Sequence, residues 1–255
     1  MDTHNTLIVG IVILLVLGAG GVLWYLNEHP SPIQITHEGK DSAPQVIEEH
    51  AEYFDITATT PSSVPIKNDA EAVAAMHQYV LSQIETFKEQ GNFNNLSLED
   101  IQVFGYDQGR KQSLEITYET KRGPHTISYV FLQYVDTFGA HPNVYYRTFT
   151  FDTDTGALLS IGNLFTPGTD YLSLLSKEAR RILPGQLAEK AQTDTEHINM
   201  DFITDGTKPV EDNFKTWYIE GDTLVLVFPP YQVAAYVFGA PEVRLPLSTL
   251  PSVYK

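Results

Sequence analysis

Hydrophobic residues are most concentrated near the N-terminal end of the chain. From Thr6 to Leu26, 21 consecutive residues carry no charge, and most are Leu, Ile, Val or Gly. An α-helix of that length reaches about 31 Å, which matches the hydrocarbon core of a bilayer. The pattern predicts a single transmembrane anchor over residues 1–27, with the bulk of the chain extracytoplasmic. A cleaved signal peptide and a secreted protein remain the alternative, because the small residues Gly18 to Gly21 lie within the segment.

Residues 28–50 carry prolines and mixed charge without a hydrophobic period. Pro30, Pro32, Gly39 and Pro44 interrupt any regular element, and nothing in the segment suggests chemistry. Such a composition predicts a linker between the membrane and the folded part of the chain.

Residues 51–152 begin with strand-like alternation, continue with helical spacing and return to alternation. Tyr53–Thr59 alternates and is followed by Pro61, which predicts a strand. Asn68 and Glu71 have the spacing of a capping box, and a helix is predicted from about Asp69 to Gln90. Its buried stripe is expected to contain Val73, Met76, Val80, Ile84 and Phe87. An antiparallel meander is predicted from Ile101–Tyr106, Ser113–Thr120, Thr126–Val135 and Val144–Phe151.

Residues 153–255 are expected to form a second lobe. Asp152–Gly156 has the composition of a hairpin turn. A helix is predicted after Thr169 and Asp170, with Arg180 and Arg181 in its last turn and Pro184 ending it. The pattern of Gln186–Asn199 is compatible with a partly helical segment but does not determine its secondary structure. Strands are predicted at Thr216–Ile219, Leu224–Phe228 and Glu242–Pro246. The predicted fold class is therefore α+β, with two adjoining lobes of antiparallel sheet and one main helix each, after the transmembrane helix.

Composition narrows the classes of chemistry and of partner. The chain has no Cys, which excludes disulfides, Cys-based zinc sites, thiol nucleophiles and iron–sulfur clusters. It has 32 Asp and Glu against 16 Lys and Arg, giving a net charge of −16. That charge repels the phosphates of nucleic acid and favours a basic protein partner. No metal site or cofactor is predicted.

Four groups of residues, taken in order, resemble one family. They are Phe138–Asn143, with the sequence Phe-Gly-Ala-His-Pro-Asn; Phe149, Phe151 and Asp152 with Thr155 and Gly156; Asn163–Phe165; and a closing segment containing Asn213, Phe214, Pro230–Ala234, Tyr236, Gly239, Glu242 and Val243. From about Tyr53 to Leu250 the chain resembles the extracytoplasmic domain shared by RsiV-type anti-sigma factors and PdaC-type peptidoglycan deacetylases. Two positions depart from the family: Phe138 stands where Gly is usual, and Ala235 where Pro is frequent.

The resemblance implies two adjoining α+β lobes that meet near Asp152. In RsiV-type proteins the domain binds lysozyme and signals to a cytoplasmic sigma-factor-binding segment, for which Met1–Asn5 leave no room here. In PdaC-type enzymes catalysis lies in a separate domain with a metal-binding Asp and paired His. The nearest histidines here, His125 and His141, are 16 positions apart and form no such pair. The chain is therefore expected to be a module without either effector and not an enzyme.

Two loops hold the candidate binding residues. Phe138 and His141 lie in the first, and Pro229, Tyr231 and Tyr236 in the closing loop. Histidine is a candidate base or pH-sensitive contact, and tyrosine offers a rigid amphipathic anchor; the structural alternatives are a loop-shaping His and buried aromatic rings.

A possible calcium loop lies between the two predicted lobes. Asp152, Asp154 and Gly156 resemble its opening, but the later ligands are missing, which favours an ordinary turn.

Three classes of function follow. The leading hypothesis is a membrane-anchored, extracytoplasmic binding module of the bacterial cell envelope that recognises cell-wall material or a wall-active protein such as lysozyme. The first alternative is a cell-envelope enzyme, a hydrolase or deacetylase-associated protein with a carboxylate or His site assembled from distant residues. The second is a structural partner of another membrane protein, although Gly10 and Gly18 lack the spacing of a helix-pairing motif.

Overall fold

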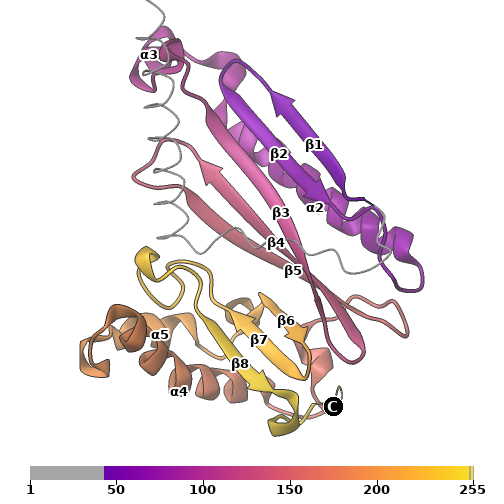
Figure 1. Ribbon diagram of the computed structural model, residues 1–255. Helices are drawn as coiled ribbons and strands as arrows, with labels where there is room; N and C mark the ends of the chain where they lie inside the picture. Colours follow the sequence, from indigo (N-terminus) through magenta and orange to yellow (C-terminus); the bar gives the residue numbers. More distant parts are fainter. Residues whose placement is uncertain (1–42, 253, 255) are drawn as a thin grey trace, which may run out of the picture. The chain divides into compact units, whose positions relative to one another are not determined.

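The structure, a computed structural model, describes residues 43–252 and 254. It confirms an α+β fold, with one five-stranded mixed sheet, one three-stranded antiparallel sheet and helices beside them (Figure 1). All described residues belong to one compact unit. The predicted anchor over Thr6–Leu26 and most of the predicted linker lie outside the described residues. None of the helices within 43–252 is both long and apolar enough to cross a bilayer.

The five-stranded sheet has the order β1-β2-β3-β4-β5. Its strands are β1 (Gln45–His50), β2 (Phe54–Thr60), β3 (Gln112–Arg122), β4 (Thr126–Asp136) and β5 (Asn143–Asp152). The prediction of an entirely antiparallel sheet is wrong at one pair, because β2 runs parallel to β3. The chain between these strands contains a helix, and such a crossover connection returns the chain so that the next strand runs in the same direction.

Strand β1 occupies the end of the segment predicted to be a linker. Ile47 packs against the core beneath the sheet, and Glu49 forms an ion pair with Lys88 of the neighbouring helix. Val46 is exposed, so the strand shows no clear apolar alternation in its sequence. Its position is set by pairing with β2 and by these contacts.

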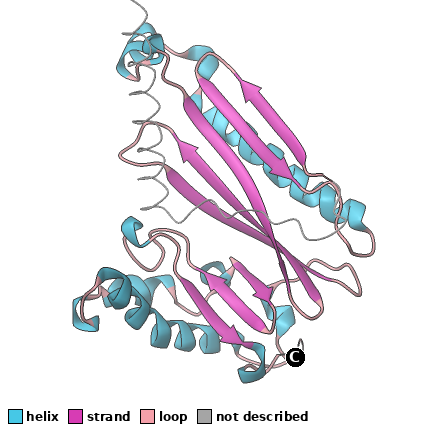
Figure 2. Ribbon diagram, in the orientation of Figure 1, coloured by secondary structure: helices cyan, strands magenta, loops and turns pink. Residues whose placement is uncertain are grey.

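Helix α2 (Asp69–Gly91) covers one face of the five-stranded sheet (Figures 1 and 2). The predicted helix is confirmed, and Met76, Val80, Ile84 and Phe87 are buried as expected, whereas Val73 is partly buried at the edge of the core. The predicted capping box is wrong. Asn68 has a φ of 57° and makes no side-chain cap bond, because it adopts the left-handed conformation that Asn tolerates instead of the extended backbone of a capping residue.

The predicted strand Ile101–Tyr106 is also wrong. Residues Leu98–Val103 form helix α3, and a 3₁₀ turn follows at Tyr106–Gln108. Ser97 Oγ accepts from the Asp100 backbone N–H at 3.0 Å, while the Asp100 carboxylate accepts from the Ser97 N–H at 3.0 Å. This reciprocal capping box starts a helix where the alternation of Ile101 and Val103 suggests a strand.

The three-stranded sheet has the order β6-β7-β8, formed by Trp217–Glu220, Thr223–Val227 and Glu242–Pro246. Helix α4 (Tyr171–Ala191) packs on one face of it, and the short helix α5 (Met200–Gly206) follows (Figure 1). The core between helix and sheet includes Leu175, Ala179, Leu183 and Leu187 from α4, with Ile219, Leu224, Leu226, Val243 and Leu245 from the strands. Further 3₁₀ turns lie at Phe93–Asn95, Ile161–Leu164, Thr195–His197, Glu211–Phe214, Tyr236–Phe238 and Leu247–Thr249.

Helix α4 does not end at Pro184. Asp170 caps its start as predicted, accepting from the Ser173 N–H at 3.2 Å, but the helix continues through Pro184 to Ala191. Proline removes one backbone hydrogen bond and normally breaks a helix. Here Leu183 and Leu187, on either side of Pro184, are buried in the core, and this tertiary packing stabilises the continuous helix.

The two sheets contact each other through the face of β6 and β7 that α4 does not cover. Tyr218, Val225 and Val227 are buried there, with Val130 and Tyr146 of the five-stranded sheet packed against them. Lys121 of β3 forms ion pairs with Glu119 at 3.0 Å and with Glu220 of β6 at 3.3 Å. The loop between β4 and β5 and the loop between β7 and β8 carry the predicted binding residues.

Candidate functional site

Three of the five predicted binding residues meet in the structure. His141 Nε2 lies 2.8 Å from Tyr231 Oη, although the residues are 90 positions apart. The His141 ring stacks on the Tyr236 ring with centroids 3.7 Å apart and planes inclined by 18°. The Tyr231 and Tyr236 rings are 5.7 Å apart. We call His141, Tyr231 and Tyr236 the aromatic cluster.

The carbonyl of Pro142 joins the two loops of the cluster. Its oxygen accepts from Tyr236 Oη at 2.7 Å and lies 2.9 Å from His141 Nδ1. Both ring nitrogens of His141 therefore have partners in the part of the chain that is described. The role of the Pro142 carbonyl could not be recognised from side-chain types in the sequence.

The closing loop holds Tyr231 at the surface in a defined position. Tyr231 is 52% exposed, and its φ of 70° lies in the left-handed region. The next side chain, Gln232, donates from Nε2 to the carbonyls of Gly206 and Asn213, each at 2.9 Å. Farther along, Lys190 of α4 donates to the Phe238 carbonyl at 2.9 Å. These anchors limit the conformations that the loop must lose on binding a partner.

Phe138 belongs to a separate contact. Its ring lies 5.7 Å from that of Tyr106 and 6.4 Å from that of Phe104, and the Arg110 guanidinium is 4.0 Å from its centroid. Its φ is 64°, in the left-handed region that favours glycine, and its N–H donates to the Asp136 carboxylate at 2.9 Å. The structure thus does not bring Phe138 to the cluster.

Pro229 shapes the closing loop, since its carbonyl accepts from the Gln232 N–H at 3.0 Å. Within the described part of the chain, Pro229 takes no part in the aromatic ring contacts that join His141, Tyr231 and Tyr236.

The Asp152–Gly156 segment forms the predicted turn. Asp152 Oδ1 accepts from the N–H groups of Asp154 and Thr155 at 3.0 and 2.7 Å, and Gly156 has a φ of 80°. Partial burial raises the pKa of Asp152, but hydrogen bonds from Tyr254, Thr155 and Asp154 outweigh it and lower the pKa below its ordinary value. Burial and the bond to Asp152 raise the pKa of Tyr254 to about 12. Across residues 43–252 and 254, no three His, Asp or Glu side chains are grouped as metal ligands would be.

A charged network lies beside the contact between the sheets and has no signal in the sequence pattern. Tyr218 Oη donates to Glu242 Oε1 at 3.0 Å, and Arg244 pairs with Glu242 at 3.2 Å and with Glu220. Burial, with the Glu242 charge, raises the pKa of Tyr218. Burial likewise raises the pKa of Tyr146, with smaller effects from Glu242 and Glu119. Both phenols therefore stay protonated at neutral pH.

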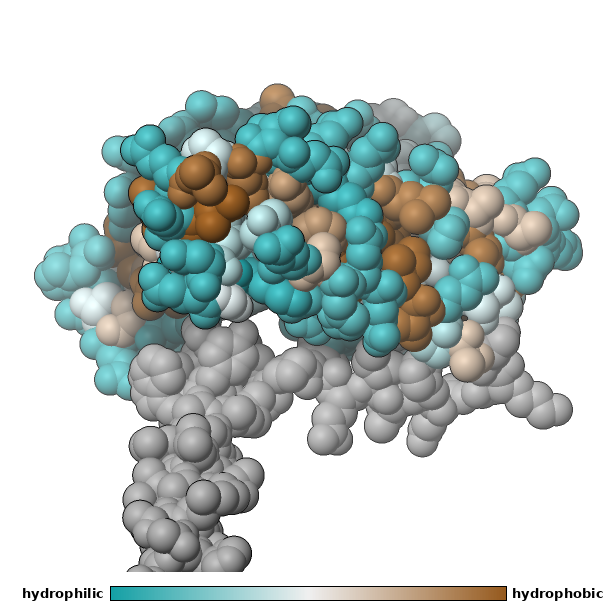
Figure 3. Space-filling model, turned by 90° about the horizontal axis from the view of Figure 1, so that it is seen from above, coloured by the Kyte–Doolittle hydropathy of each residue, from teal (hydrophilic) through white to brown (hydrophobic). Residues whose placement is uncertain are grey.

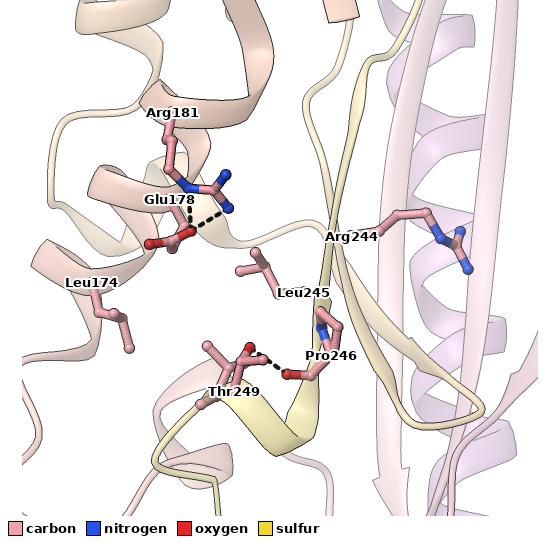
Figure 4. A pocket seen from close by; sticks show the side chains of 8 residues that line it. Leu174, Glu178, Arg181, Arg244, Leu245, Pro246 and Thr249 are labelled. Carbon is pink, nitrogen blue, oxygen red and sulfur yellow. Dashed lines mark hydrogen bonds and ion pairs between the residues drawn. The ribbon is translucent and has the colours of Figure 1, made fainter. Parts of the chain in front are cut away.

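A cavity of about 220 Å³ lies between α4 and the end of β8 (Figure 4). Its lining comprises Leu174, Glu178, Arg181, Arg244, Leu245, Pro246, Thr249 and Leu250. Glu178 and Arg181 form an ion pair at 2.7 Å, and the Arg244 side chain points away from the cavity in Figure 4. None of the predicted binding residues lines it.

Exposed apolar side chains occur at several separate places. Leu98, Val103 and Phe104 lie in and after α3, and Val237 in the closing loop is 80% exposed. Figure 3, which looks down on the end where α3 lies in Figure 1, shows hydrophobic patches divided by hydrophilic residues. Hydrophobicity alone therefore does not single out one interface on this face. Val237 is notable because it adjoins Tyr236 in the chain.

Comparison with known proteins connects the chain to a family. Residues 162–248 match the family model described as "Protein of unknown function (DUF3298)". Over 147 residues, 57% of this chain, the sequence is 30% identical to the peptidoglycan-N-acetylmuramic acid deacetylase PdaC of Bacillus subtilis strain 168. The match covers 30% of PdaC, so the chain corresponds to less than a third of that relative's length. The resemblance to the PdaC-type domain is thereby confirmed.

Solved structures support the fold. A DUF3298 family protein from Pseudomonas aeruginosa PAO1 aligns with a TM-score of 0.53 and 14% identity, covering 84% of this chain and 96% of its own. A DUF3298 family member from Bacteroides fragilis NCTC 9343 aligns with a TM-score of 0.55 and 14% identity, covering 83% and 92% respectively. At this identity the likeness concerns the fold alone.

Proposed function

We propose, taking the DUF3298 domain shared with PdaC as the premise, that this protein is a non-catalytic binding module of the bacterial cell envelope. The proposed partner is a basic wall-active protein such as lysozyme, bound at the aromatic cluster. The relative's name refers to deacetylation of peptidoglycan, and we assign the shared segment to an accessory region and not to its catalytic part. We further propose that Thr6–Leu26 anchors the chain in the membrane, with residues 28–255 on the extracytoplasmic side.

The convergence of His141, Tyr231 and Tyr236 carries this proposal. Two loops about 90 positions apart in the chain are joined by hydrogen bonds between His141 Nε2 and Tyr231 Oη at 2.8 Å and from Tyr236 Oη to the Pro142 carbonyl at 2.7 Å. Tyr231 nevertheless remains 52% exposed. Aromatic side chains held in place before binding lose little conformational entropy, which is why Tyr is frequent among residues that dominate interfaces. A buried structural cluster would not need an exposed ring at its rim.

Charge favours a basic protein over a neutral glycan as the partner. The net charge of −16 attracts a cationic protein at long range and accelerates encounter. Attraction between exposed charges is screened within about 8 to 10 Å at ordinary ionic strength. Binding is therefore expected to weaken as salt is added, while the aromatic contacts persist.

Biolayer interferometry with the purified full-length chain in mild detergent tests the proposal. The probes are c-type lysozyme, a muropeptide mixture and an oligomer of N-acetylglucosamine, each at low and high salt. We expect lysozyme to bind with an affinity that falls as salt rises. Binding of a glycan without binding of lysozyme would show that the partner is cell-wall material and not a basic protein. No binding by any probe at tens of micromolar would overturn the proposed function. Release of acetate from the muropeptides would instead support the enzyme alternative.

A further inference from the structure

We infer that His141 fixes the Tyr231 hydroxyl as a hydrogen-bond acceptor toward the partner, so that the aromatic cluster selects a donor group. In the basic protein proposed above, that group is a Lys or Arg side chain. The inference rests on the proposed function, because it names the chemistry recognised at the same surface. It makes His141 a positioning residue that determines specificity through Tyr231.

The first step is the proton on His141 Nδ1. This atom lies 2.9 Å from the Pro142 carbonyl oxygen. A carbonyl oxygen has lone pairs and no proton, so the hydrogen of this bond must come from Nδ1. The structure therefore assigns the tautomer with Nδ1–H.

The second step follows from the neutral imidazole. When Nδ1 carries the proton, Nε2 has a lone pair and can only accept. Tyr231 Oη, at 2.8 Å, must then donate its single proton to Nε2. What remains on this oxygen is acceptor capacity, and it belongs to a side chain that is 52% exposed.

Two further contacts keep the imidazole from turning over. Its face is stacked on Tyr236 at 3.7 Å, and Tyr236 Oη donates at 2.7 Å to the same Pro142 carbonyl. A flipped ring would place Cδ2 against the Pro142 carbonyl and Cε1 against Tyr231 Oη, and both hydrogen bonds would be lost. The direction of the Tyr231 O–H is thus set before any partner arrives.

The consequence for recognition is a difference between donors and acceptors. An ammonium, guanidinium or amide N–H can bond to Tyr231 Oη without disturbing the cluster. A carboxylate or carbonyl would face lone pairs, unless Tyr231 gave up its bond to His141 and left Nε2 without a partner. A basic partner therefore fits this surface in hydrogen-bond polarity as well as in charge.

Nuclear magnetic resonance of the full-length chain tests the tautomer without any partner. The histidine ring nitrogens are labelled with ¹⁵N, spectra are recorded at about pH 8.5, above the range in which histidines usually titrate, and His141→Gln identifies the His141 signals. We expect a protonated Nδ1 and an unprotonated Nε2, and we expect the Nε2 signal to move in Tyr231→Phe, which lacks the donated proton. A protonated Nε2 in the neutral ring, or an Nε2 signal unchanged in Tyr231→Phe, would overturn the inference.

Binding by Tyr231→Phe tests the consequence for the partner. This variant keeps the ring and loses the acceptor oxygen, so the affinity for c-type lysozyme is expected to fall about tenfold or more, as for a hydrogen bond to a charged group. An unchanged affinity in a variant with the wild-type unfolding temperature would contradict the donor assignment. If no probe binds the wild-type chain, the proposed function fails, and the tautomer is still decided by the resonance experiment.

Discussion

Replacing Phe138 with Gly tests what stabilises the unusual backbone of the loop before β5. The φ of 64° at Phe138 costs a non-glycine residue about 1 kcal/mol. Glycine removes that cost but adds freedom to the unfolded chain, a loss of about 0.5 to 1 kcal/mol. These two effects nearly cancel, so the outcome depends on the aromatic ring.

The ring makes three contacts that glycine would lose. Partial burial of the phenyl group contributes about 1 kcal/mol. The contacts with Tyr106 at 5.7 Å and Phe104 at 6.4 Å contribute about 0.5 kcal/mol each. Arg110, 4.0 Å from the ring centroid, contributes about 0.5 kcal/mol at an exposed position. We therefore expect Phe138→Gly to lower the free energy of unfolding by about 2.5 kcal/mol.

Urea unfolding followed by tryptophan fluorescence measures this loss. Thr137→Gly, at the exposed neighbouring position, is the matched control and should cost no more than about 1 kcal/mol. Arg110→Ala combined with Phe138→Gly should be less destabilising than the separate changes added together, since both remove the same contact. A Phe138→Gly variant as stable as the wild type would refute the reasoning, because backbone strain would then equal the whole contribution of the ring.

Two further perturbations test the closing loop and the turn after β5. A methyl group at Gly206 would collide with the Gln232 carbonyl, so Gly206→Ala is expected to lower the free energy of unfolding by about 2 kcal/mol or more, whereas Gly185→Ala, with open space around it on α4, should raise it by about 0.5 to 1 kcal/mol. Equal melting temperatures for these variants would contradict the predicted clash. The lowered pKa of Asp152 stabilises the fold above the ordinary carboxyl pKa, and this stabilisation is lost as the pH falls through the folded-state value. Tyr254→Phe removes one of the bonds that lower the pKa, so its melting temperature should lie below the wild type at pH 7 and approach it in acid; a difference independent of pH would argue against this linkage.

Hydrophobic spacing in the sequence correctly predicts helices and strands that bury one face against the core. Helix α2 agrees within a residue at its C-terminal end because its stripe, including Met76 and Ile84, packs directly on the sheet. The predictions are wrong where hydrogen bonds to the backbone or packing in the core determine the secondary structure. The Ser97 cap turns an alternating segment into α3, and buried neighbours carry α4 through Pro184. The parallel pairing of β2 with β3 depends on the path of the connection, which local alternation does not encode.

The candidate site was predictable in residue type but not in arrangement. Tyr231 and Tyr236 stand among prolines and a glycine, and His141 precedes a proline, which is typical of loops that expose side chains. Their meeting across 90 positions depends on how the sheets pack. Phe138 is close to His141 in sequence, yet its ring packs beside Arg110 and not in the cluster.

The affinity of c-type lysozyme for Tyr231→Ala, set against Tyr145→Ala, tests the central claim most directly. The two tyrosines are 52% and 50% exposed, and Tyr145 lies on the face of β5 opposite to Tyr146, which packs against the second sheet. Our account predicts at least a tenfold loss for Tyr231→Ala, as expected of a dominant interface residue, and less than a threefold loss for Tyr145→Ala. Equal affinities for the two variants, with both folded, would contradict the assignment of the aromatic cluster as the binding surface.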